Sequence, residues 1–361
     1  MSRSKKLKNL HSIFKDKAKI IKSKFSITNH TITSSIQVTV LRATTRSTRT
    51  PPQDHLISAL ISFGHTTRHS ASACISTIIN RLHHHNEPNA YVTLKSLITL
   101  HYMINSGSFF LKEQQKNSLQ NFSSTNFDFL NLSRFMDNTD IQSREFSIWA
   151  QWYARFLESH LVTSNVLGCV TSLSKTDILE KHKEKMKFSL YMDLFKEVDS
   201  LVSTIEEICN APKSLHCQTN DIVYEVMRLV GEDYRMLQYH TMIRLTELNE
   251  RMHKLSTVEL NELTWCLARL ERCKERLTEL FVNRKRNKSF WDLENELMVK
   301  LMRLKQEKEM ESVSWKMIEY VTESTQLHKQ LIEYNRPLER LPFGAFGKGN
   351  NWGNQCFFMA G

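Results

Sequence analysis

Residues 142–172 read QSREFSIWAQWYARFLESHLVTSNVLGCVTS, and this stretch decides the fold class. Phe146, Trp149, Tyr153 and Phe156 recur at steps of three or four residues, which places them on one face of an α-helix. An aromatic row at helical spacing is typical of a buried core, because aromatic rings bury a large apolar surface. The stretch therefore predicts a long helix whose aromatic side faces the core.

The sequence around this helix lacks the residues that other fold classes need. Residues 108–335 contain only Gly168, Gly231 and Pro212 as helix breakers. An all-β fold requires many more turns, and a nucleotide-binding α/β fold requires Gly-rich loops. We therefore predict an all-α protein in which short N-terminal helices precede long antiparallel helices in a bundle.

Further helices are expected on both sides of the aromatic stretch. The apolar spacing predicts them over residues 34–46, 54–63, 70–84, 88–105, 175–210, 221–230 and 234–255. Pro88 is placed in the first turn of its helix. We divide the chain into a basic segment (1–29), a helical domain (30–335) and a tail (336–361) that is predicted to be disordered.

Two heptad-like rows occupy the C-terminal half. The first is Leu260, Leu263, Leu267, Leu270, Leu277 and Leu280, and the second is Met310, Val313, Met317, Tyr320, Ser324, Leu327 and Leu331. Packing of antiparallel helices within one bundle explains such rows, and a coiled coil with a partner explains them equally well.

Nearly all of the excess positive charge lies at the N-terminal end. The chain carries a formal net charge of +11, and residues 1–55 hold twelve Lys and Arg against two Asp. A local excess of this kind predicts an anionic partner, either a membrane surface or a nucleic acid.

Residues 4–25 favour the membrane. Leu7, Leu10 and Phe14 begin an apolar row that continues at helical spacing, and Lys5, Lys6, Lys8 and Lys15 lie among the basic residues around it. This is the pattern of a helix that lies in a lipid interface, although a basic arm packed on the domain has the same pattern. The row lacks the stacking aromatics of single-strand binders, so we expect no nucleic-acid partner.

No pattern indicates catalysis or membrane spanning. A P-loop, a GxSxG motif and paired CxxC motifs are absent, and no run of 18 apolar residues or secretory signal occurs. The seven scattered Cys indicate reduced thiols in the cytosol. His65 and His69 have the spacing of a helical metal pair but lack a third ligand, so we expect no metal, no cofactor and no enzymatic activity.

Four segments resemble the ANTH domain of the plant clathrin-assembly proteins. They are VLRATT (40–45) before a Pro-containing turn, KSLITLH (95–101), NLSRFMD (131–137) and WYARFL (152–157). The resemblance implies a helical solenoid that ends in a bundle, binding of phosphatidylinositol 4,5-bisphosphate, and assembly of clathrin coats in endocytosis. It also implies binding of vesicle SNARE helices, and a location at the cytosolic face of coated pits, on coated vesicles and at the Golgi apparatus.

The lipid site implied by the resemblance is only partly retained. The family pattern Lys-x9-Lys-x-Lys-His corresponds here to Arg42, Pro52, Asp54 and His55. Two cations are therefore replaced, one of them by an anion, while Arg46 and Arg49 offer nearby compensation. The alternatives are an inositide site formed by Arg42, Arg46, Arg49 and His55, attraction to anionic lipid in general, and a helical scaffold that has lost the lipid site. Because the tail has no Asn-Pro-Phe, Asp-Pro-Phe or clathrin-box sequence, clathrin binding is implied by the family alone.

Overall fold

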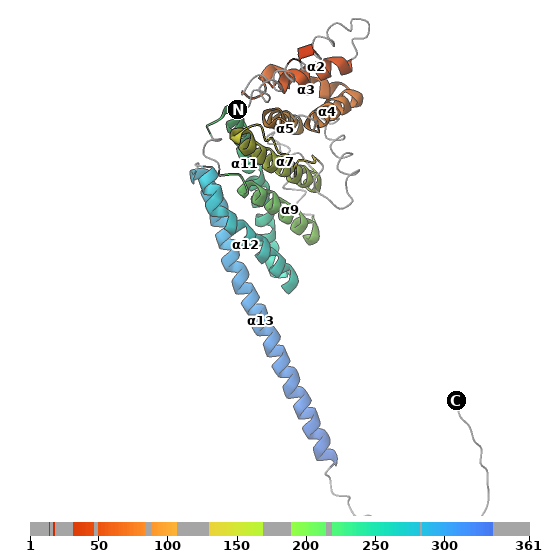
Figure 1. Cartoon of the computed structure of the whole chain (residues 1–361). Coiled ribbons are helices and arrows are strands. Elements are labelled where there is room, and N and C mark those ends of the chain that lie inside the picture. Colours follow the sequence, from red (N-terminus) through yellow and green to blue (C-terminus); the bar gives the residue numbers. More distant parts are fainter. Residues whose placement is uncertain are drawn as a thin grey trace, which may run out of the picture. The chain divides into compact units, whose positions relative to one another are not determined.

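The structure, a computed structural model, describes residues 14, 17–18, 32–46, 50–83, 88–106, 130–168, 189–213, 219–281 and 284–334. In these ranges the chain forms nine α-helices and one short 3-10 helix and no strand, which confirms the predicted all-α class (Figure 1). Within the same ranges no helix is both long enough and apolar enough to cross a bilayer. The chain divides into two compact units, Met1–Lys305 and Gln306–Gly361.

Four short helices open the first unit: α2 (Ile32–Ala43), α3 (Asp54–Thr66), α4 (Arg68–Leu82) and α5 (Ala90–Asn105). Each of α2, α3 and α4 packs against the other two, and α5 packs against all three. Polar caps set two of the boundaries. The side chain of Thr67 accepts a hydrogen bond from the Ser70 amide at 3.1 Å, and that of Asn89 accepts one from the Val92 amide at 3.0 Å.

The placement of Pro88 inside a helix is therefore wrong. Asn89 is the N-cap, so α5 begins at Ala90 and Pro88 precedes it. The side-chain bond from Asn89 satisfies an amide that would otherwise lack a partner at the start of the helix, which fixes the boundary after the proline.

The aromatic stretch forms α7 (Ile141–Leu167), which packs between α5 and α9 (Tyr191–Cys209). Phe146, Trp149, Tyr153 and Phe156 are all buried, as predicted. The helix ends at Gly168, whose φ of 66° is the left-handed conformation that glycine adopts without a steric penalty.

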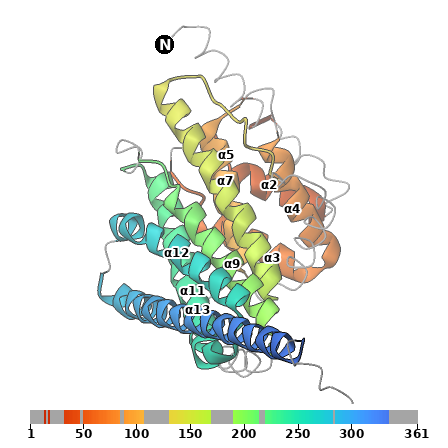
Figure 2. The same cartoon turned by 90° about the horizontal axis from the view of Figure 1, so that it is seen from below.

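Long helices complete the first unit (Figure 2). They are α11 (Asp221–Arg251) and α12 (Thr257–Leu280), and the short 3-10 turn η1 (Met252–Lys254) lies between them. Helix α9 packs against both α11 and α12. A reciprocal capping box between Ser256 and Glu259 begins α12. The first heptad row lies on α12, and its members from Leu260 to Leu277 are buried, which accounts for that row by packing within the chain.

The prediction of two helices over residues 221–255 is wrong, because α11 continues through Gly231. A Cβ atom at this position would lie 3.1 Å from the Phe281 ring. That ring stacks on Tyr234 with a centroid separation of 5.0 Å. Gly231 thus permits the close approach of an aromatic side chain and does not end the helix.

The last helix, α13 (Arg284–Tyr334), contributes to both units. In the first unit Phe290, Trp291, Leu297 and Leu301 are buried, and Lys300 Nζ donates to Asn249 Oδ1 at 2.6 Å.

In the second unit the described apolar side chains of α13 are exposed. Members of the second heptad row, Met310, Val313, Met317, Tyr320 and Leu327, each expose more than half of their surface. Packing within the bundle and a coiled coil with a partner therefore both stay predictions for this row.

A buried polar network joins α5, α7 and α11. His101 contacts the Tyr153 hydroxyl at 2.7 Å through Nδ1 and an oxygen of Asp233 at 2.6 Å through Nε2, while Asn105 donates to the other oxygen of Asp233 at 3.0 Å. Burial alone would raise the pKa of Asp233, but the nearby charges of His101 and His160 and these hydrogen bonds outweigh it and lower the pKa. The core of the first unit therefore contains an ionised carboxylate that depends on its partners.

We expect Asp233→Ala to lower the free energy of unfolding by about 3 to 5 kcal/mol, because it removes the carboxylate that His101 and Asn105 contact inside the core. Urea unfolding monitored by circular dichroism measures the change. Glu250→Ala on the exposed side of the same helix is the matched control and should change stability by less than about 0.5 kcal/mol. Equal effects of the two substitutions would contradict a structural role for the network.

Candidate functional site

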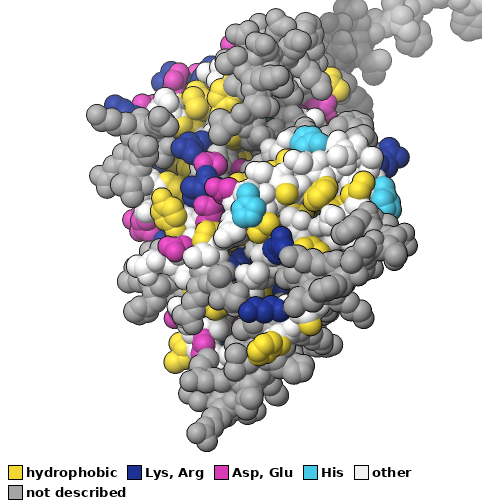
Figure 3. All heavy atoms as spheres, turned by 90° about the horizontal axis from the view of Figure 1, so that it is seen from above, with side chains coloured by type: hydrophobic (Ala, Val, Ile, Leu, Met, Phe, Trp, Pro, Cys, Tyr) yellow, Lys and Arg dark blue, Asp and Glu magenta, His cyan; other side chains and the backbone are white. Residues whose placement is uncertain are grey.

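The structure places three of the predicted lipid-binding residues around one turn between α2 and α3. Arg42 lies in the last turn of α2 and is exposed, Arg46 follows the helix and is half-buried, and His55 lies exposed in the first turn of α3. Arg49 falls outside the described residues. Seen from above, the His side chains and several Lys and Arg side chains lie at the centre and right of the face, while most of the visible acidic side chains lie to the left among further Lys and Arg (Figure 3).

Two buried cations hold this turn from the inside. From α4, Arg81 donates through Nε to Thr44 Oγ1 and through Nη2 to the Thr44 carbonyl, both at 3.3 Å. From α5, Lys95 Nζ donates to the Thr45 carbonyl at 3.0 Å. Carbonyls at the C-terminus of a helix lack partners within the helix, and cations are favourable there because the helix dipole is negative at that end.

Lys95 is only 1% exposed. Burial lowers the pKa of its ammonium group to about 8. Because Lys95 and His101 both belong to the KSLITLH segment, the structure gives that segment an internal role: one residue supports the turn and the other supports the core. Neither Arg81 nor Lys95 is among the predicted site residues, and the one signal for Lys95 is a lysine in the middle of a largely apolar helix.

Pro52 and Asp54 occupy the two positions at which the family pattern has lysines, and both suit the local backbone. Pro52 is buried next to Gln53, whose extended backbone forms the N-cap of α3 without a side-chain bond. Asp54 is exposed in the first turn, where a carboxylate interacts favourably with the positive end of the helix dipole. These replacements stabilise the start of α3 and remove positive charge from the surface of the turn.

Most of the predicted insertion segment lies outside the described residues. This applies to Lys5, Lys6, Lys8, Lys15, Leu7 and Leu10. Phe14 is described. Its backbone is helical and its side chain is 66% exposed. Membrane insertion by this segment stays a prediction.

His65 and His69, whose spacing suits a metal pair only on one helix, do not share a helix. His65 lies in the last turn of α3 and His69 in α4, and Thr67 between them has an extended backbone with φ −145° and ψ 159°. Among the described residues no group of three or more His, Cys, Asp or Glu side chains could hold a metal ion.

The ANTH domain family matches residues 35–291, which include every helix from α3 to α12. The chain belongs to the ANTH domain family. Family members are non-enzymatic scaffolds. Two Arabidopsis thaliana relatives, each named "Putative clathrin assembly protein", are 36% and 33% identical to this chain. Both alignments cover 78% of this chain, and they cover 76% and 81% of the relatives. A chain from a solved structure titled "Structure of the endocytic adaptor complex AENTH" aligns at 17% identity with a TM-score of 0.43, covering 70% of this chain and 98% of that one.

We expect Lys95→Met to loosen the turn, because the Thr45 carbonyl loses a charged donor. Hydrogen–deuterium exchange of residues 42–46 should become at least several-fold faster, while exchange of α12 stays unchanged. Lys254→Met, which alters an exposed lysine on η1, is the control. Unchanged exchange at residues 42–46 would show that Lys95 does not support the turn.

Proposed function

We propose that this chain is a peripheral membrane adaptor of clathrin-mediated endocytosis, and that the turn between α2 and α3 is its membrane-binding surface. The observation that carries the proposal is the pair of exposed groups, Arg42 and His55, on either side of a turn fixed by two buried cations. Membership of the ANTH family and the names of the relatives support the coat-adaptor role.

The geometry favours binding because residues 42–46, at the end of α2, are already held in place before they meet a phosphate. Arg81 and Lys95 already fix the backbone that carries Arg42 and Arg46, so little conformational entropy is lost on contact. Arginine suits this role, since its guanidinium offers paired donors to phosphate oxygens. Each basic residue near an acidic leaflet contributes about 1 kcal/mol, so the turn and the N-terminal lysines together are sufficient for reversible docking.

We further propose that the headgroup of phosphatidylinositol 4,5-bisphosphate is the preferred ligand, held by Arg42, Arg46, Arg49 and His55. Asp54 opposes this preference, because its carboxylate is adjacent to His55 in the sequence and repels phosphate. Two unit charges of the same sign at 4 Å repel by about 4 kcal/mol at an effective dielectric constant near 20. The specificity therefore depends on the Asp54 carboxylate pointing away from the bound headgroup.

A second candidate function is a helical protein-interaction scaffold that has lost the lipid site. Buried Pro52 and acidic Asp54 favour it, since both replace cations of the family pattern. Through the family resemblance, we also propose that the chain binds clathrin and a vesicle SNARE helix directly. Only the membrane-adaptor function requires affinity for acidic lipid, which separates the two candidates.

Flotation with three vesicle sets tests the choice: neutral lipid, phosphatidylserine, and phosphatidylinositol 4,5-bisphosphate at matched charge. We expect binding to be strongest with the inositide. Arg42→Glu should weaken it about 30-fold, because reversing one charge removes about 2 kcal/mol at about 1 kcal/mol per unit charge.

Two further variants complete this experiment. Asp54→Lys should strengthen binding by a similar factor, and Arg144→Glu, on an exposed position of α7, should leave it unchanged. Equal binding to both acidic sets would reduce the site to general attraction. The absence of binding to any set would favour the scaffold function.

A further inference from the structure

Two cysteines meet where the end of α9 packs against α12. Cys209 is the last residue of α9, and Cys273 lies in the second half of α12. The Cys209 thiol donates to the Cys273 carbonyl at 3.8 Å, and the two thiols lie within hydrogen-bonding reach of each other. The fold therefore brings together two sulfur atoms whose residues are 64 positions apart in the chain.

This contact has the geometry that a disulfide requires. Two cysteines are bridged without backbone movement only where their side chains point toward each other from closely packed backbones. Helices α9 and α12 pack directly, and the Cys209 sulfur contacts both the backbone and the thiol of Cys273. Both residues belong to the first unit, so the pair joins two parts of one compact body.

The contact also makes the two thiols chemically unequal. The hydrogen bond from Cys209 lowers the pKa of Cys273, and the charges of Arg272 and Arg269 act in the same direction against the effect of burial. The same hydrogen bond, together with burial, raises the pKa of Cys209. Because the thiolate is the nucleophilic form of cysteine, Cys273 is the thiol that attacks first.

The pair differs from the other two thiols of the described ranges. Cys209 is partly exposed, so a small oxidant can reach the contact, although Cys273 itself is only 5% exposed. Cys74 and Cys266 are buried, and burial raises their pKa to about 12 and about 11. Buried thiols of this kind are unreactive, which leaves Cys209 and Cys273 as the reactive pair.

We propose that Cys209 and Cys273 are an oxidation site, at which hydrogen peroxide forms a reversible disulfide between α9 and α12. The Cys273 thiolate attacks one peroxide oxygen, so that an S–O bond forms and the O–O bond breaks. The hydroxide that leaves takes up the proton that Cys273 had lost and becomes water. The product is a sulfenic acid at Cys273.

Cys209 completes the reaction. Its sulfur attacks Cys273 Sγ, so that the S–S bond forms and the S–O bond breaks, and the leaving hydroxide becomes a second water with the proton from Cys209. The two thiols thus lose two electrons, and the peroxide gains them. A reducing dithiol reverses the change by thiol–disulfide exchange.

The disulfide would close a loop that contains all of α11 and η1. Closing so long a loop restricts the unfolded chain and stabilises the folded one. In a reducing compartment the pair stays as two thiols, and disulfides that form there are usually transient and redox-sensing. The site does not depend on the proposed lipid function, so the two proposals can fail independently.

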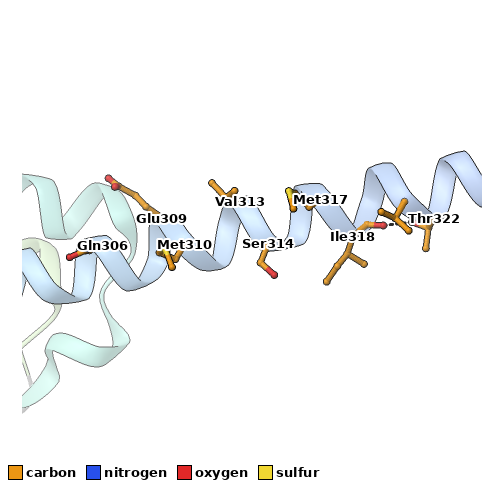
Figure 4. A pocket seen from close by; sticks show the side chains of 9 residues that line it. Gln306, Glu309, Met310, Val313, Ser314, Met317, Ile318 and Thr322 are labelled. Atoms are coloured by element: carbon orange, nitrogen blue, oxygen red, sulfur yellow. Dashed lines mark hydrogen bonds between the residues drawn. The ribbon is translucent and has the colours of Figure 1, made fainter.

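Peptide mapping without reduction tests the site after the reduced full chain has been treated with equimolar hydrogen peroxide. We expect a cross-linked peptide that contains Cys209 and Cys273 and has lost two hydrogen atoms. Exposed methionines such as Met310 and Met317, which project from α13 in the second unit (Figure 4), also react with peroxide. Each of them gains an oxygen atom instead, so the two products are distinguished by mass.

Stability and trapping give two further measurements. Oxidation should raise the midpoint of thermal unfolding by several degrees, and dithiothreitol should reverse the rise. Cys273→Ala should lose both the cross-link and the rise, whereas Cys266→Ala, at the other thiol of α12, should keep both. In Cys209→Ala the sulfenic acid should remain on Cys273, where dimedone labels it. Circular dichroism confirms that each variant keeps its helix content.

Two results would overturn the proposal. One is the absence of the cross-link while the exposed methionines are oxidised, since peroxide would then have acted without bridging the pair. The other is a cross-link from Cys209 to Cys217, its neighbour in the sequence, in place of Cys273. Dimedone labelling that persists in Cys273→Ala and is absent in Cys209→Ala would overturn the assignment of Cys273 as the attacking thiol.

Discussion

The structure of the first unit depends on the burial of α5 together with its polar side chains. Thirteen of the sixteen residues of this helix are buried, Lys95 and His101 among them. A buried charge or imidazole is costly unless it is hydrogen-bonded. Each of these two residues forms its hydrogen bonds with a different neighbouring element. Lys95 contacts the end of α2, and His101 contacts α7 and α11. One helix thus fixes the candidate membrane surface to the rest of the domain.

This arrangement separates the residues that shape the turn from those that meet a ligand. Arg81 and Lys95 are buried and held by backbone carbonyls of the turn, whereas Arg42 and His55 are exposed on the outside of it. A fixed backbone with exposed cations is suited to phosphate groups at a flat surface. Asp54 limits the attraction while it stabilises the start of α3, so stability of the turn and affinity for anions compete at one position.

The sequence predicts the features that depend on periodicity and fails for those that depend on contacts across the chain. The aromatic row of α7 and the leucines of α12 are buried as expected, because apolar spacing alone determines which face packs. Gly231 led to the wrong prediction of a helix end. A glycine stands there because the Phe281 ring, fifty residues later, approaches the backbone closely. The internal role of Lys95 could not be predicted from the sequence either, because its partner Thr45 lies fifty positions away in the chain. Of the candidate site, the exposed Arg42 and His55 could be predicted, and the cations that hold the turn could not.

The central claim is that the turn between α2 and α3 meets the membrane. Hydrogen–deuterium exchange of the full chain, with and without vesicles that contain phosphatidylinositol 4,5-bisphosphate, tests it most directly. The account predicts slower exchange of residues 42–46 and of the first turn of α3 with these vesicles, and no change with neutral ones. Protection confined to other segments, with the turn unaffected, would contradict it.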